Sequence, residues 1–200
     1  MFTPVFTFEL NYHLRQRLFY ILCSVFFLLT VLATTSPNVS MGPNFNNANI
    51  NAPIAVISTL ASASILALFG AVAFVASGVV RDFEQKTAEL FFTTRVRKAD
   101  YIYGRFFGAL LFSFGIYFSA GLGVFVGELM PWLDQERIGA ISFEAYWFAS
   151  WAIVLPNIFT ASCIFFCLAT VTRNMMYTYV AAIALLMLTF VIGSFDEPET

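Results

Sequence analysis

The chain has 200 residues, of which 60% are hydrophobic and only 11% are charged, with a formal net charge of −2. A soluble domain of this size is about 45–50% apolar and about 25% charged, so the composition excludes an ordinary soluble domain. The mean hydropathy of +0.80 indicates a chain that lies mostly in lipid.

The first segment, residues 1–17, is more polar than the rest of the chain. Phe6, Leu10, Leu14 and Leu18 recur at four-residue steps, which places apolar side chains on one face of a helix. We therefore predict an amphipathic helix lying in the membrane interface, with a mobile leader as the alternative. No small-residue cleavage site follows the first apolar run, so we do not expect a signal peptide.

Five apolar runs without a charged residue follow this segment. Runs of about 18 residues or more match the roughly 30 Å hydrocarbon core of a bilayer when they are helical. Helices are expected because every backbone amide in lipid needs an internal partner. Residues 18–200 are thus predicted to form an all-α, polytopic membrane helix bundle. Its five predicted spans are residues 18–35, 54–80, 106–127, 145–172 and 174–195.

Lysine and arginine are divided unequally between the two sides of this predicted bundle. Of the ten basic residues, only Arg137 falls between the third and fourth spans. The others precede the first span, lie in the 81–105 loop, or separate the fourth and fifth spans. Basic residues concentrate in cytoplasmic loops, so we predict that the N-terminus and the 81–105 loop are cytoplasmic.

The third and fourth predicted spans carry the candidate packing and pathway residues. Small residues at four-residue steps allow close approach of two helices in lipid, either within this bundle or between chains. In the third span and just before it, these residues are Gly104, Gly108, Gly115, Ser119, Gly123 and Gly127. In the fourth span, Pro156 interrupts the backbone hydrogen bonding and Asn157 places an amide at membrane depth. This kink either shapes a pathway or only fits the bundle.

Catalysis by this chain is not indicated. The sequence has a single histidine, His13, and therefore no paired histidines of a zinc-protease motif. It also has no glycine-rich loop for ATP phosphates. We expect no enzyme activity, no metal and no cofactor, and no nucleic-acid partner.

The segment Asp82–Phe92 is the most informative part of the cytoplasmic loop. Asp82 can cap a helix whose first turn holds Glu84, and Phe83, Leu90 and Phe91 supply an apolar side. A charged helix just below the membrane suits contact with a cytoplasmic partner. The alternative is a solvated loop that only satisfies the charge asymmetry.

This loop resembles the cytoplasmic signature of type-2 ATP-binding-cassette exporter permeases. In that family an acidic helix that begins with arginine is followed by a turn. The next span then begins with the pattern Tyr-x-x-Gly-Lys/Arg. The matching residues are Arg81, Glu84, Thr87, Glu89, Leu90, Val96, Tyr101, Gly104 and Arg105. Lys86 and Arg95 depart from the pattern, where glycine and proline are usual. The resemblance implies contact with a separate ATPase subunit. The candidate coupling residues are Asp82, Phe83, Glu84, Thr87, Glu89, Leu90 and Phe91.

A closer similarity is to the N-terminal membrane half of bacterial proteins that fuse such a permease to a zinc aminopeptidase domain. It is carried by Phe8-Glu9-Leu10, Ala73–Ala76, Gly104-Arg105-Phe106 and Met130–Asp134. That membrane half usually has six spans, so five spans would be a partial permease half.

The resemblance implies a permease subunit of an exporter in a bacterial inner membrane. Its partners would be an ATPase, a second permease copy or half, and the lipid bilayer. The alternative function is a membrane anchor or scaffold for a peptidase or regulatory complex, without transport.

Overall fold

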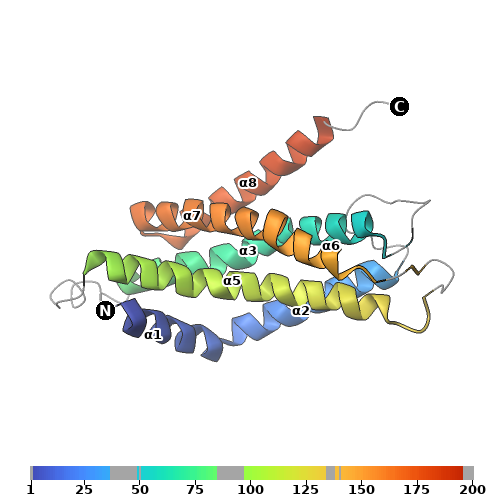
Figure 1. The fold of residues 1–200 in the computed structure, drawn as a ribbon. Coiled ribbons are helices and arrows are strands. Elements are labelled where there is room, and N and C mark those ends of the chain that lie inside the picture. Colours follow the sequence, from blue (N-terminus) through green and yellow to red (C-terminus); the bar gives the residue numbers. More distant parts are fainter. Residues whose placement is uncertain are drawn as a thin grey trace.

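A computed structural model describes residues 2–36, 49, 51–84, 97–133, 138–139 and 141–195, and all regular elements in these ranges are helices. This confirms the all-α prediction. The helices pack as a bundle whose long members run roughly side by side (Figure 1). In chain order they are α1 (Phe2–Arg15), α2 (Arg17–Thr35), α3 (Pro53–Glu84), α5 (Lys98–Glu128), α6 (Phe143–Phe148), the π-helix η2 (Ala149–Val154), α7 (Leu155–Thr172) and α8 (Met175–Phe195).

Four helical segments in the described part of the chain are long and apolar enough to cross a membrane. They are Arg17–Thr35, Pro53–Arg81, Lys98–Glu128 and Phe143–Thr172, and they contain the first four predicted spans. The fifth predicted span coincides with α8, where the apolar stretch found is the shorter Met175–Thr189. A fifth crossing therefore remains a prediction.

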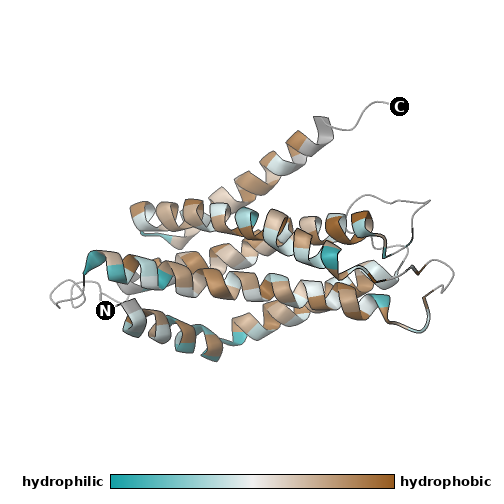
Figure 2. Cartoon of the chain, in the orientation of Figure 1, coloured by the Kyte–Doolittle hydropathy of each residue, from teal (hydrophilic) through white to brown (hydrophobic). Residues whose placement is uncertain are grey.

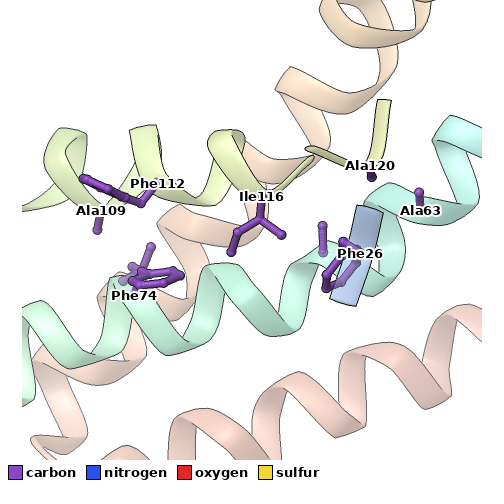
Figure 3. Close-up of a cluster of buried hydrophobic side chains, with 9 residues drawn as sticks. Phe26, Ala63, Phe74, Ala109, Phe112, Ile116 and Ala120 are labelled. Carbon is purple, nitrogen blue, oxygen red and sulfur yellow. The ribbon is translucent and has the colours of Figure 1, made fainter. Parts of the chain in front are cut away.

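Helix α3 is the centre of the bundle. In its apolar stretch 72% of the residues are buried, against 6% in α2, which packs mainly on α5. One side of α3 faces α2 and α5, where Phe74 lies against Phe112 and Ile116 (Figure 3). Its other side faces α7 and α8 through Val72, Ala76 and their neighbours. Burial of these side chains from both sides fixes α3 between the two layers.

The helices of the bundle are hydrophobic along most of their length (Figure 2), and many of their apolar side chains are exposed. On α2, Ile21, Val25, Leu28 and Leu32 share one helix face and are each 48–59% exposed. Contiguous apolar surfaces of this kind are rare on soluble monomers. The four long helices and their apolar exteriors are compatible with a multi-pass membrane protein.

Four parts of the chain meet at one end of the bundle (Figure 1). They are the N-terminus of α1, the end of α3, the start of α5 and the α7–α8 turn. We call this end the basic end because Arg81, Lys98, Arg105 and Arg173 belong to it. Helices α1 and α2 are separated by Gln16, whose backbone is extended with φ −75° and ψ 122°. The far end of α8 diverges from the other helices (Figure 1).

The turn between α7 and α8 is only two residues long. Arg173 has a left-handed backbone with φ 52°, and its N–H donates to Ala169 O at 2.9 Å, which ends α7. The side chain of Asn174 then accepts a bond from Met176 N at 2.9 Å and caps α8. Side-chain acceptors of this kind satisfy the free N–H groups at a helix start.

Candidate functional site

Helix α1 lies directly against α3 and α5 at the basic end, because glycines on these helices leave room for it. A Cβ atom built on Gly104 would lie 2.9 Å from Val5 Cβ, and one on Gly108 would lie 2.9 Å from Glu9 Cβ. On α3, a Cβ on Gly78 would approach Glu9 Oε1 to 3.0 Å. The separations at Gly104 and Gly108 are too short for a side chain, and a Cβ on Gly78 would displace the Glu9 carboxylate. The three glycines therefore form a recess that receives Glu9.

Glu9 is fully buried and is held by two arginines. Arg81 Nη2, at the end of α3, donates to Glu9 Oε2 at 3.0 Å and Oε1 at 3.3 Å. Arg105 Nη1, in the second turn of α5, donates to Oε1 at 3.1 Å and Oε2 at 3.2 Å. The side chains of Glu9, Arg105 and Arg81 are 0%, 2% and 11% exposed. One carboxylate thus joins three helices.

Aromatic rings complete the surroundings of both arginines. The guanidinium carbon of Arg81 lies 3.7 Å from the centroid of the Tyr12 ring, and that of Arg105 lies 5.1 Å from the Tyr101 ring. Cations are attracted to the faces of such rings. A cation–π contact therefore supports each arginine beside the single carboxylate.

His13 lies one helical turn after Glu9 on α1. Its ring is fully buried between Phe74 and Phe112, with ring centroids 5.1 Å away in each case. Nδ1 lies within hydrogen-bond distance of Gln16 Oε1, at 3.0 Å. Nε2 lies 3.7 Å from Glu9 Oε1.

The position of His13 favours its neutral form. Burial lowers the pKa of His13 from its ordinary value of 6.5, and the charges of Arg81 and Arg105 lower it further. The bond to Gln16 and the charge of Glu9 oppose this shift, but burial is the largest effect. At neutral pH the group formed by Glu9, His13, Arg81 and Arg105, which we call the Glu9 cluster, therefore carries one negative and two positive charges.

The Glu9 cluster acts as a clamp, because one buried carboxylate on α1 is bound by arginines of both α3 and α5. Arg81 and Arg105 lie on either side of residues 85–96 in the sequence, and both bind the same side chain of α1. Removing one partner from a buried ion pair typically costs about 3–5 kcal/mol, because the remaining charge is left without compensation in a site poorly accessible to water. The cluster therefore couples the position of α1 to both helices that flank this segment.

The predicted coupling segment does not begin a separate helix at Asp82. Helix α3 continues through Glu84, so Asp82, Phe83 and Glu84 belong to its last turn instead of capping a new helix. Helix α3 thus extends beyond the predicted span, which ends at residue 80. The other candidate coupling residues, Thr87, Glu89, Leu90 and Phe91, lie outside the described residues, and their role remains a prediction.

The predicted packing residues all lie on the side of α5 that faces α1 and α2. They are Gly104, Gly108, Gly115, Ser119, Gly123 and Gly127, and the residues that face them in the same order are Val5, Glu9, Phe19, Cys23, Phe27 and Thr34. Of the two arrangements that the sequence left open, the structure therefore has the contact within the chain. The closest approach is at Gly123, where an added Cβ would come within 2.6 Å of Phe27 O and would overlap Thr30 Oγ1.

Pro156 and Asn157 lie at a local change in helix geometry. The π-helix η2 immediately precedes Leu155-Pro156, and a proline that lacks an N–H disrupts regular i→i−4 bonding. The amide of Asn157 donates to Ser64 Oγ on α3 at 3.0 Å, and Ser64 is fully buried. Asn157 thus has a structural partner inside the bundle, while a role in a pathway remains a prediction.

Sequence reasoning missed the Glu9 cluster. It assigned Phe6, Leu10, Leu14 and Leu18 to an apolar face toward the membrane interface, which remains a prediction, but it gave no indication that Glu9 is buried. One feature of the sequence could have indicated a close contact here. The small-residue series begins at Gly104, which precedes the third predicted span. A helix that packs closely before it enters the membrane needs a neighbour there.

No protein-family model and no curated protein sequence matches the chain. In the part of the chain that the structure describes, no group of three His, Cys, Asp or Glu side chains is placed to hold a metal ion. The function is therefore inferred from the geometry of the Glu9 cluster and from the sequence pattern around it.

Proposed function

We propose that this chain is the membrane-spanning permease subunit of an ATP-driven exporter in a bacterial inner membrane, acting with a separate ATPase and a second permease copy or half. The observation that carries the proposal is the binding of Glu9 by both Arg81 and Arg105. These arginines border the segment that resembles the cytoplasmic signature of type-2 ATP-binding-cassette exporters.

The bundle provides a physical route for a movement that starts at the basic end. A displacement of residues 82–96 moves the end of α3 and the start of α5, and the Glu9 cluster makes α1 follow. From Gly104 to Gly127, α5 then lies in close contact with α1 and α2. At 1.5 Å per residue this contact extends about 35 Å, roughly the thickness of a membrane. Closely packed helices transmit displacement because their interiors compress little.

A membrane anchor or scaffold is the second candidate. It is favoured by α8, which diverges from the bundle (Figure 1) and exposes apolar side chains such as Val180, Met187 and Leu188 to 59–61%. An apolar helix without neighbours on most sides suits attachment to another membrane protein. This function requires no movement at the basic end, and therefore no ATPase.

The two functions are separated by co-purification. The tagged full chain is expressed in its host, crosslinked in membranes and purified, and any ATPase with a Walker motif is identified by mass spectrometry. The exporter function predicts that such an ATPase is recovered, and that Leu90→Asp lowers its recovery at least tenfold. Apolar anchors carry most of the energy in a desolvated interface.

Glu84→Ala is the comparison variant, because a charge at the rim of an interface contributes less than an apolar anchor. We expect it to lower ATPase recovery less than about threefold. Membrane insertion of both variants serves as the control. If the wild-type chain recovers no ATPase, the anchor function replaces the exporter. If Leu90→Asp recovers the ATPase at the wild-type level, residues 82–92 are not the docking element.

A further inference from the structure

An open hollow is lined by residues of α5 and of the α6–η2 segment. Helix α6 lies at the end of the bundle opposite the N-terminus of α1 (Figure 1). The hollow has a volume of about 510 Å³ and is lined mainly by aromatic side chains together with one carboxylate. The lining residues are Phe118, Phe143, Glu144, Tyr146, Trp147 and Ser150. Neither the proposed export nor the anchor function uses this hollow.

The aromatic lining is held in place by a second row of contacts. Phe125 lies 6.0 Å from Phe143 and 6.3 Å from Tyr146, measured between ring centroids. The Tyr146 hydroxyl donates to Glu128 Oε1 at 2.7 Å. The Trp147 ring lies 5.4 Å from another indole, that of Trp151. Each of the Phe143, Tyr146 and Trp147 rings therefore has a neighbouring aromatic ring beside the hollow.

The charges around the hollow favour a cation. Glu144 is exposed and forms no hydrogen bond or ion pair with any part of the chain that the structure describes. Behind Tyr146, Glu128 is only 4% exposed, and its Oε2 atom has no hydrogen-bond partner among the residues that the structure describes.

The position of the hollow indicates where the cation comes from. Phe143 begins the apolar segment Phe143–Thr172, which is long enough to cross a membrane. Residues of its first turns therefore lie at the level of the lipid head groups, where tryptophan and tyrosine are enriched. Phe118 and Trp147 are 61% and 68% exposed and offer apolar surface to acyl chains beside the hollow.

We propose that this hollow binds the ammonium group of a lipid head group, as in phosphatidylethanolamine. Glu144 is the counter-charge, and the rings of Phe143, Tyr146 and Trp147 supply cation–π contacts. Such contacts strengthen when the cation loses water, and an aromatic site with a carboxylate at its edge achieves this at a membrane surface. The proposal does not depend on ATP-driven export.

The test uses Trp147 as its own reporter. A full-length chain with Trp132→Phe and Trp151→Phe retains one tryptophan in the hollow, and it is placed in phosphatidylglycerol nanodiscs. Increasing phosphatidylethanolamine is expected to change the Trp147 emission in a saturable way. N-acyl phosphatidylethanolamine, which keeps the phosphate but lacks the ammonium charge, is expected to cause no such change.

Variants in this background identify the ligand contacts. Glu144→Gln is expected to weaken the apparent lipid affinity about fivefold, and Phe143→Leu about threefold, in keeping with exposed ion pairs and cation–π contacts. Phe107→Leu, an exposed aromatic on α5 near the basic end, is the matched control and should have no effect. Unchanged thermal unfolding of the variants verifies that the bundle is intact.

Two results overturn the proposal. The first is that phosphatidylethanolamine changes the Trp147 emission equally in the parent chain and in Glu144→Gln. The carboxylate would then not act as the counter-charge. The second is a saturable response to soluble ethanolamine or tetramethylammonium with none to the lipid, because the source of the ammonium group is then not a head group. A lipid affinity weakened about fivefold in Glu144→Gln, with no saturation by the soluble amines, supports the proposal.

Discussion

Replacing Glu9 by glutamine removes the only negative charge of the Glu9 cluster with almost no change in volume. The amide has one acceptor oxygen in place of two, and its NH₂ group would face the donors of Arg81 and Arg105. Arg105 is only 2% exposed and cannot regain water without movement of α1. The expected cost is about 3–5 kcal/mol, the range for breaking a buried ion pair from one side.

This cost is expected to appear as local opening of α1. The helix is attached to the rest of the bundle mainly through α5, so its undocking leaves the other helices packed. Hydrogen exchange of the α1 amides, measured by mass spectrometry in detergent or nanodiscs, reports the opening free energy. At 1.4 kcal/mol for each factor of ten, this cost corresponds to an acceleration of exchange by about 100- to 4,000-fold in Glu9→Gln.

The matched control is Glu144→Gln, which makes the same chemical change at an exposed residue of the opposite end. It should change exchange in α1 by less than about 0.5 kcal/mol, as expected for surface positions. If Glu9→Gln affects α1 no more than this control, the two arginines do not hold the helix and the clamp is refuted. In the double variant Glu9→Gln/Arg105→Gln, the loss of opening free energy should be smaller than the sum of the losses in the two single variants. The expected difference is about 0.5–3 kcal/mol.

Three further predictions concern packing, pH and the backbone. Gly123→Leu should lower thermal stability by about 1–3 kcal/mol through overpacking against α2, whereas Gly121→Leu, whose Cβ would meet only Leu60 at 4.0 Å, should not; equal effects would contradict the close contact. Because the pKa of His13 is lowered in the fold, stability should be complete above about pH 6.5 and fall as the pH decreases below it, by at most about 1.4 kcal/mol per unit. His13→Phe should lack this component, and a stability difference from wild type that stays constant between pH 7.5 and 5.5 would show that His13 does not titrate in this way. Arg173→Val should be about 1–2 kcal/mol less stable than Arg173→Gly, because a β-branched side chain opposes a left-handed backbone; equal unfolding temperatures would refute this assignment.

Much of the architecture follows from the sequence because it depends on one local property. Uncharged apolar runs such as 106–127 must be helical in lipid, so the helices and their approximate ends could be predicted without any tertiary information. The side of α5 that packs closely was also indicated, since small residues at four-residue steps share a helix face. The sequence predicted a new helix capped by Asp82, whereas α3 continues through Glu84, because charged residues can continue a helix beyond the apolar span.

The Glu9 cluster depends on tertiary structure alone. Glu9 is separated from Arg81 by 72 positions and from Arg105 by 96, and nothing local distinguishes it from an exposed carboxylate on an amphipathic helix. Only the close approach of α1 to α3 and α5 removes water from the carboxylate and brings the two arginines to it. The sequence by itself determined which segments are helical and apolar; the packing of those helices decided which charges are buried together, because burial depends on neighbours that are distant in the chain.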